Sequence, residues 1–227
     1  MKIIYEDNHL LVVEKPVNIP VQADSSNDED LLSLRKDYIK KAYDKPGNVY
    51  LGLVHRLDRP VGGVMVFART SKAASRLSKA VSTRQFGKTY LAVVEGTPES
   101  DSGSFEDYLV KDNDTNTVTV TDAAHGKHAL LDYQLLGHKD GLSLLRIRLH
   151  TGRSHQIRVQ TSSRGLPIWG DQRYNRNAKK HQQIALWSYR LEFDHPVTGV
   201  HLIFTCDPPD AYPYSLFEGV NYEKDTF

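Results

Sequence analysis

The stretch HRLDRPVGGVMVFART (55–70) joins a charged loop to an apolar run. Its second half, GGVMVFART (62–70), is a glycine-led segment rich in Val and Phe, and this pattern predicts a buried strand. Pro60 stiffens the loop before the strand, and the paired glycines let other backbone approach closely. Asp58 therefore lies on a rigid loop that leads into the core, where a reactive group can be held in place.

Asp58 is the single acid between Arg56 and Arg59. Nearby cations keep a carboxylate ionised even when water is removed. A desolvated carboxylate can attack an electrophilic carbon, so Asp58 is a candidate nucleophile. A local salt bridge on a surface loop is the alternative interpretation, and the short motif alone does not separate the two.

The rest of the chain alternates between strand and helix patterns. A helix is expected within 29–47 and closed by Pro46 and Gly47; another follows Ser71 as its cap; and Ser154 is expected to cap a short helix over 155–165. Residues 97–104 are polar and predict a loop. Strands are expected at 9–16, 88–96, 117–121, 128–136, 142–150, 184–193 and 200–206, with turns at GHKDG and DHPVTG.

Strands outnumber helices, and several neighbouring strands read as antiparallel pairs. We therefore expect an α+β fold with a large mixed, mainly antiparallel sheet flanked by helices and loops. No shift in composition marks a boundary, which predicts a single domain over residues 1–227.

Composition bounds the class of protein. The 227 residues are 39% hydrophobic and 25% charged, as is ordinary for globular proteins. No run approaches the roughly 18 apolar residues of a membrane helix, and the N-terminus does not read as a signal peptide. Cys206 is the only cysteine, so no internal disulfide can form. We expect a cytoplasmic protein without a membrane partner.

Charge is unevenly distributed. The net charge is only +1, yet residues 146–190 contain ten Lys or Arg and one acid, Asp171. Such a basic region is expected where a protein faces nucleic-acid phosphates. A solvated face with acids paired to it from elsewhere in the chain is the alternative.

The segment RLHTGRSHQIRVQ (148–160) contains a second candidate site. Arg158 lies about one turn inside the expected helix, and its planar guanidinium can hold a carboxylate through two parallel hydrogen bonds. We expect it to hold Asp58; a phosphate contact or an ordinary surface charge is the alternative. His150 and His155 suggest a metal, but further ligands are missing, so no metal site is predicted.

Tyr90 lies within GKTYLAVVEG (87–96), an expected strand. An aromatic residue in the middle of a strand is most often part of the core. Tyr90 acquires a functional interpretation if it faces a cleft, where its ring can stack on a nucleobase.

Together these segments resemble RluA-type pseudouridine synthases. HRLDRPVGGVMVFART, KTYLAVVEG and LHTGRSHQIRVQ are similar, in order and spacing, to the three motifs of that family. The opening EDNHLLVVEKPVNIPVQ, the segment LPIWGDQRYN and the closing ALWSYRLEFDHPVTGVHLIFTCDPP resemble its supporting parts. The resemblance covers residues from about 3 to 213.

The resemblance implies an enzyme that isomerises uridine to pseudouridine in rRNA or tRNA, without a cofactor or metal. It implies that Asp58 is the nucleophile, that Arg158 pairs with it and that Tyr90 packs on the target base. Arg56 corresponds to the position that fills the space left by the flipped nucleotide. The remaining motif side chains are expected to contact substrate: His55, Lys88, Arg153 and His155.

Three departures from the family pattern are visible. Val61-Gly62-Gly63 replaces a serine-containing tripeptide, and Gln160 stands where histidine is more common. The chain also begins at the catalytic domain, so we expect no S4-like RNA-binding domain before it. We expect a monomer whose partner is RNA.

Two other functions compete with this one. The first is a catalytically idle relative that binds or folds RNA, which the presence of Asp58, Tyr90 and Arg158 disfavours. The second is a glycoside or nucleoside hydrolase that uses Asp58. Such enzymes usually need a second carboxylic acid, and none lies in the three motifs.

Overall fold

The computed structural model describes residues 2–223. They form two compact units, each built from separate parts of the chain. Unit 1 comprises residues 2–87 and 188–207, and unit 2 comprises residues 88–187 and 208–223. The expectation of one domain over the whole chain stays a prediction.

Unit 1 is a layer of antiparallel strands. Its order is β1-β2-β4-β10, with β3 paired to β4 and β11 paired to β10. Strands β2 and β4 form the centre of the core, and every residue of β4 is buried. The bounds are β1 (Ile3–Glu6), β2 (Leu10–Lys15), β3 (Gly52–Leu53), β4 (Gly62–Ala68), β10 (Leu186–Asp194, in unit 1 from residue 188) and β11 (His201–Thr205).

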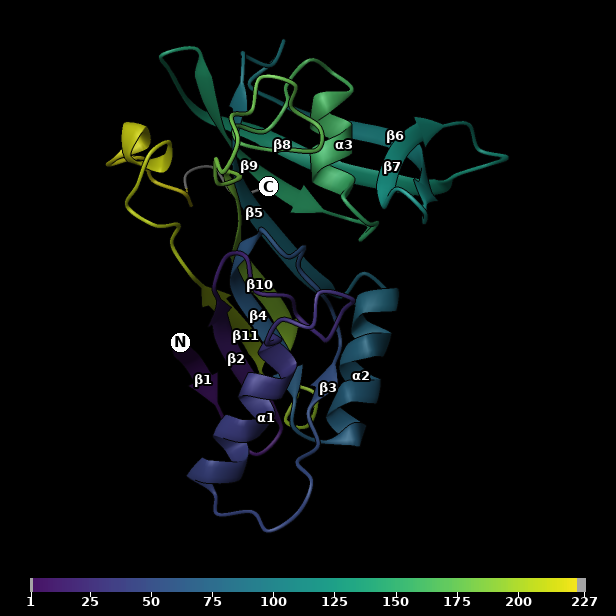
Figure 1. Cartoon of the computed structure of the whole chain (residues 1–227), viewed down its shortest axis with the longest axis vertical. Coiled ribbons are helices and arrows are strands. Elements are labelled where there is room, and N and C mark those ends of the chain that lie inside the picture. Colours follow the sequence, from purple (N-terminus) through teal and green to yellow (C-terminus); the bar gives the residue numbers. More distant parts are fainter. Residues whose placement is uncertain (1, 224–227) are drawn as a thin grey trace. The chain divides into compact units, whose positions relative to one another are not determined.

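Two helices belong to unit 1 (Figure 1). Helix α1 (Leu31–Ala42) begins at Asp30, whose carboxylate accepts the Ser33 N–H at 3.0 Å. It ends before the expected stop at Pro46-Gly47. Helix α2 (Ser71–Ser82) begins one residue earlier than predicted, because Thr70 and not Ser71 accepts the capping N–H, from Ala73 at 3.2 Å.

Gly63, at the start of β4, has a backbone and a packing environment that require glycine. Its φ is +117°, and a Cβ added there would lie 2.2 Å from the carbonyl oxygen of Ser188 in β10. No other residue can adopt this backbone and leave room for β10. The glycine thus lets two segments of unit 1 that are far apart in sequence lie against each other.

Unit 2 is a second antiparallel layer, in the order β5-β9-β8-β6-β7. The GHKDG turn is confirmed: Lys139 pairs with Leu142, and both Asp140 and Gly141 have positive φ, as a two-residue hairpin turn requires. The bounds are β5 (Phe86–Glu95, in unit 2 from residue 88), β6 (Ser102–Asp112), β7 (Thr117–Thr121), β8 (Lys127–Lys139) and β9 (Leu142–Leu149).

Strand β6 was not predicted. The expected loop 97–104 overlaps its start, and the strand shows little alternation because only Phe105 and Leu109 are buried. It nevertheless pairs with β7 on one side and β8 on the other. Helix α3 (Gln156–Ser162) packs against β6 and β7, and the short helix η1 (Tyr214–Phe217) contacts β8 (Figure 1).

The predicted α+β class with a large, mainly antiparallel sheet flanked by helices and loops is confirmed. Within the described residues, no helix is both long and apolar enough to cross a membrane.

Asp7 links two turns of unit 1. One of its carboxylate oxygens accepts the N–H groups of His9 and Leu10, both at 2.7 Å. The other accepts the Tyr5 hydroxyl and lies 2.9 Å from Nε2 of His195, a residue of the turn between β10 and β11. Burial alone would raise the pKa of Asp7, but these hydrogen bonds outweigh it and leave the pKa below its ordinary value.

Asp7→Ala should lower the free energy of unfolding by about 2 to 3 kcal/mol at neutral pH, because hydrogen bonds to a charged group are lost. The folded-state pKa of Asp7 is below the ordinary value of 3.8, so this stabilisation is complete above 3.8 and disappears as pH falls through the lower value. Urea unfolding of both proteins across this range measures it. A difference that persists unchanged in strong acid would contradict the ionised role of Asp7.

Candidate active site

Asp58 lies on the loop between β3 and β4 in unit 1. Its backbone carbonyl accepts the N–H of Val61 at 3.0 Å, which closes a tight turn directly before the buried strand. Its side chain is partly buried. The neighbouring Arg59 extends away to Asp28, Asp24 and the Asn18 carbonyl, whereas Arg56 is exposed. The turn therefore fixes the backbone that carries the predicted nucleophile.

The buried amine of Lys15 bonds to the backbone of this turn. Lys15 was not predicted as a site residue from the sequence. Its side chain has no exposed surface. The amine donates to three carbonyls: Pro16 at 3.0 Å, Arg59 at 3.0 Å and Val61 at 2.7 Å. Three acceptors match the three N–H groups of an ammonium. Two of the carbonyls flank Asp58 on its C-terminal side, so the amine ties the end of β2 to the candidate loop.

Burial lowers the pKa of Lys15 to about 7. The charge of Asp58 opposes this shift, and that of Arg59 adds to it. The electrostatic coupling shows that the amine and the predicted nucleophile share one environment. A lysine at the end of the apolar run LLVVEK was the signal that could have identified it.

His55 fixes the other side of the loop. Its Nε2 accepts the backbone N–H of Val66, in β4, at 3.1 Å, and its ring lies 5.4 Å from the ring of Phe86. An Nε2 that accepts a hydrogen bond belongs to a ring protonated on Nδ1 only. These contacts favour a role for His55 in anchoring the loop; the substrate contact expected for it stays a prediction.

Tyr90 and Lys88 lie on β5 in unit 2. Tyr90 is opposite Ile147 of β9 and is 7% exposed. Lys88 is directed toward the loop before α3, because a Cβ on Gly152 would lie 2.9 Å from its amine. Burial lowers the pKa of Lys88. The lack of a side chain at Gly152 makes room for this amine beside the arginine motif.

The arginine motif forms α3, but not with the predicted cap. His155, not Ser154, is the residue before the helix; it has a left-handed backbone with φ of 50° and makes no capping hydrogen bond through its side chain. The helix ends at Ser162, earlier than expected. The Gln156 side chain instead accepts the Arg153 N–H and the Thr151 hydroxyl, which organises the first turn.

Arg158 is buried on α3, as predicted, with 6% of its surface exposed. Its Nε and Nη2 donate to the two carboxylate oxygens of Asp171 at 2.8 and 2.7 Å. Asp171 also accepts the backbone N–H groups of Arg173 and Tyr174. This side-on pair fixes the guanidinium through one of its edges and leaves the Nη1–Nη2 edge to face another group.

Tyr174 completes the surroundings of Arg158. The guanidinium carbon lies 5.1 Å from the centre of the Tyr174 ring, within the range of a cation–π contact. The Tyr174 hydroxyl accepts the Val118 N–H at 2.9 Å and lies 2.7 Å from Nδ1 of His155. His155 and Arg158 are thus brought together through Tyr174 rather than along one helical face.

Two other motif residues have structural contacts in unit 2. Arg153 is exposed, and its Nε donates to the His128 carbonyl at 2.8 Å. Gln160 has no exposed surface, and its amide nitrogen donates to the carbonyl of Phe105 and the carboxylate of Asp107. Glutamine at this position therefore joins α3 to β6.

Within unit 1 the structure places His55, Arg56 and Asp58 on one loop. Within unit 2 it gathers the residues of the arginine motif, joined by Asp171 and Tyr174, which sequence reasoning missed. Asp171 could have been noticed as the single acid in the basic segment 146–190. The pairing of Asp58 with Arg158 stays a prediction.

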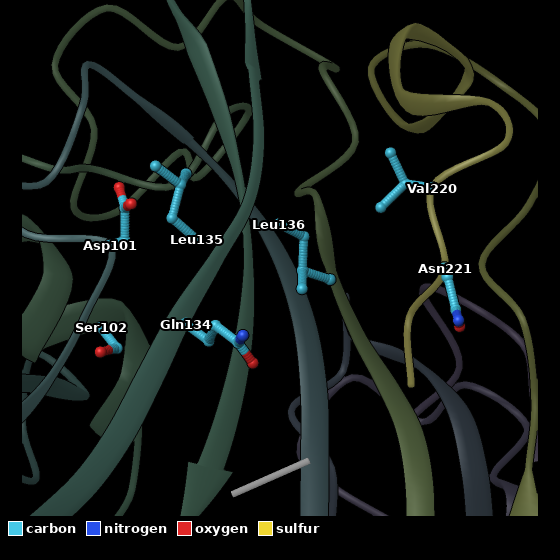
Figure 2. A pocket seen from close by; sticks show the side chains of 7 residues that line it. All are labelled: Asp101, Ser102, Gln134, Leu135, Leu136, Val220 and Asn221. Atoms are coloured by element: carbon cyan, nitrogen blue, oxygen red, sulfur yellow. The ribbon is translucent and has the colours of Figure 1, made fainter. Parts of the chain in front are cut away.

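A pocket of about 480 Å³ lies elsewhere in unit 2 (Figure 2). It is formed by side chains before and within β6, on β8 and in the C-terminal segment, namely Asp101, Ser102, Gln134, Leu135, Leu136, Val220 and Asn221. None of the predicted site residues lines it. Among the described residues, no three His, Cys, Asp or Glu side chains gather as a metal site would require.

Known proteins similar to this chain point to one activity. Residues 9–163 match the family described as RNA pseudouridylate synthase. The ribosomal large subunit pseudouridine synthase D of Zymomonas mobilis is 31% identical over 92% of this chain and 69% of the relative. The enzyme of the same name from Vibrio cholerae is 32% identical over 92% of this chain and 68% of the relative.

The fold has a solved counterpart. The structure of human RNA Pseudouridylate Synthase Domain Containing 4 superposes with a TM-score of 0.81 at 23% identity, covering 95% of this chain and 91% of that chain. This likeness supports the fold class independently of the motifs.

Lys15→Met should change how stability depends on pH. In the wild type the folded state loses the Lys15 proton near pH 7, whereas the unfolded chain keeps it up to about 10.5. The unfolded state binds more protons in this window, so the free energy of unfolding should rise with pH there. Denaturant unfolding at several pH values should show a smaller rise for Lys15→Met. An identical pH dependence would show that the buried amine titrates normally.

Proposed function

Because the chain belongs to the RNA pseudouridylate synthase family, we propose that it isomerises uridine to pseudouridine in large-subunit ribosomal RNA. Family membership rests on the match over residues 9–163. The ribosomal substrate rests on relatives named ribosomal large subunit pseudouridine synthase D, whose length this chain covers by more than two thirds. The finer RluA-type assignment rests on the three motifs.

The observation that supports the chemistry is the way Asp58 and Arg158 are held. Each is held by a buried side chain: the Lys15 amine bonds to the backbone of the Asp58 turn, and the Asp171 carboxylate bonds to the Arg158 guanidinium. Preorganised charges act on a reacting group without the cost of reorganising at the moment of reaction. In our proposal Asp58 is the nucleophile, and the Nη1–Nη2 edge of the Arg158 guanidinium pairs with its carboxylate.

The reaction is an isomerisation. The bond between N1 of uracil and C1′ of ribose breaks, the base turns, and a bond forms between C5 and C1′. C5 loses its proton and N1 gains one, so atoms balance without a co-reactant.

A uridine inside a stem must be extruded before it can react, at a cost of a few kcal/mol. We assign Tyr90 to packing on the extruded base and Arg56 to the space left in the RNA. Exposure of Arg56 suits such a contact. Lys88, Arg153 and His155 are proposed to contact the substrate near the arginine motif.

An idle RNA-binding relative is the alternative, and it lacks a reason to keep the two buried charged clusters. We also propose that the protein acts in the cytoplasm as a monomer, with the single cysteine as support for a reducing compartment.

Asp58→Asn should abolish pseudouridine formation because the amide is not a nucleophile, while RNA binding and the unfolding midpoint stay near wild type. Pseudouridine mapping of an unmodified large-subunit rRNA transcript measures the product. Asp37→Asn, on the exposed side of α1, is the matched control. Wild-type turnover by Asp58→Asn would refute the assigned mechanism.

Arg158→Met should lower turnover by roughly a hundredfold or more, with a smaller effect on RNA affinity. Asp171→Asn keeps the size of the side chain but removes its charge, and a loosened guanidinium should lower turnover by roughly tenfold with the KM for RNA little changed. Single-turnover kinetics with enzyme in excess over RNA measure the rate of the chemical step, and steady-state kinetics measure the KM for RNA. If Asp171→Asn raised KM alone, Asp171 would not position Arg158 for the chemical step.

A further inference from the structure

We propose that the exposed face of helix α2 is a second RNA-binding surface, which contacts the phosphate backbone through Lys72, Arg76 and Lys79. This inference rests on the proposed function, since it assigns to that RNA a contact outside the three motifs. It also lies outside the basic segment 146–190.

The segment that includes α2 contains basic residues and no acidic residue. Residues 59–94 contain seven Lys or Arg and no acid. Helix α2 contributes three of these cations and has no acid in its first turn. Lys72, Arg76 and Lys79 are all exposed and recur at steps of four and three residues, so they lie along one face of the helix.

The opposite face of α2 is occupied. Ala73 and Leu77 are buried, and the helix contacts β3 and β4. A Cβ on Gly52 of β3 would lie only 2.8 Å from the Cβ of Ala74, which shows how closely the helix approaches the strand. Because the apolar face is already covered, α2 has no second apolar stripe to insert into a membrane.

The cations of α2 differ from the neighbouring cations in their ion pairing. Arg59 and Arg69 belong to the same acid-free stretch, yet Arg59 pairs with Asp24 and Asp28, and Arg69 pairs with Glu6 at 2.9 Å. Within the described residues, no ion pair joins a carboxylate to the cations of α2. In the part of the chain that the structure describes, their side chains make one hydrogen bond, from Arg76 to the carbonyl of Pro196 at 2.5 Å.

The segment 146–190 contrasts with this helix. There, Arg146 and Arg158 are buried, and Arg164 and Arg190 form ion pairs with Asp107 and Glu192. Part of the charge expected to face phosphate is thus already engaged within the protein, whereas α2 presents all three cations to solvent.

Lys79 lies in the last turn, where a positive charge is favourable, but the placement of Lys72 works against the helix itself. Lys72 lies in the first turn, where a positive charge opposes the helix dipole and costs about 0.3 to 1 kcal/mol. Lys72 and Arg76 are like charges four residues apart, which is also destabilising. A bound anion would relieve both effects, so the arrangement is explained by a ligand and not by helix stability.

Phosphate groups of RNA fit this surface. Lys72 and Lys79 are seven residues apart, which corresponds to about 10 Å along a helix axis. One nucleic-acid strand of a duplex places a phosphate about every 3.4 Å of axis, so the face spans about three phosphates. The exposed hydroxyls of Ser75 and Ser78 can add hydrogen bonds to phosphate oxygens.

The test is the salt dependence of RNA binding by the double variant Lys72→Gln/Lys79→Gln. Glutamine keeps a similar helix propensity, and Arg76 is left in place because of its contact with Pro196. Binding of an unmodified large-subunit rRNA transcript is titrated between roughly 50 and 200 mM KCl. The matched control, Lys40→Gln/Lys41→Gln, removes two exposed charges from helix α1.

The α2 variant should bind roughly tenfold more weakly near the lower salt concentration, and the slope of log K against log salt should decrease by about 1.4 to 1.8, because two phosphate contacts are lost. Its unfolding midpoint should stay near that of the wild type, since the repulsion relieved at Lys72 and the favourable charge lost at Lys79 offset each other. The α1 control should keep the wild-type slope.

Equal losses in the two double variants would reduce the effect to net charge and overturn the proposal. A wild-type salt slope in the α2 variant would also overturn the proposal. A third contradicting outcome is that the wild type binds anionic phospholipid vesicles and the α2 variant does not, while the salt slope of RNA binding is the same in both. Turnover of the wild type on the same transcript is measured separately. If the wild type makes pseudouridine and the α2 slope is unchanged, this inference fails while the proposed function stands.

Discussion

A lysine side chain with no exposed surface fixes the loop on which the proposed chemistry depends. Burying a charge is costly unless polar groups replace the lost water. Lys15 meets this requirement with the carbonyls of Pro16, Arg59 and Val61, and the last two are backbone atoms of the loop itself. The loop cannot move away without leaving a buried amine unsatisfied. The cost of burying the charge thereby becomes a restraint on the position of Asp58.

Unit 2 holds its arginine by related means. The bidentate pair with Asp171 has almost no exposed surface on either side chain, and Tyr174 covers the guanidinium face. A buried ion pair is a weak source of stability, because desolvation offsets most of the attraction. It is a strong source of orientation, since a planar fork and a carboxylate fit in few ways. Both units thus use charge for placement at the expense of stability.

The sequence predicted those features that depend on local chemistry. The hairpin between β8 and β9 followed from Asp140-Gly141, which accept the positive φ that such a turn requires. The three motifs led to Asp58, Tyr90 and Arg158. Strand β6 was missed because the polar Asp107 lies between its two buried residues, Phe105 and Leu109, on the same face, so no apolar alternation is visible. Its partners β7 and β8, and not its own composition, make it a strand.

The first residues of the helices and the residues that support the site were harder to predict from the sequence. Thr70 and Ser71 are chemically similar caps, and only the backbone decides between them. Ser154 lost its expected role because His155 adopts a left-handed backbone and Gln156 supplies the hydrogen bonds. Lys15 and Asp171 act through contacts with residues 46 and 13 positions away, which no local pattern reports.

The two parts of unit 1 are synthesised at different times. Its two parts are separated by a hundred residues of unit 2, and its sheet includes β10, against which Gly63 lies. As the chain leaves the ribosome, β2 and β4 emerge long before that strand and expose one flank of an apolar sheet. Unit 2 has by then received most of its strands. The sheet of the unit that carries Asp58 is therefore the later of the two sheets to be completed, and nascent chains need protection of that flank until β11 has appeared, before the last segment of unit 2 is made.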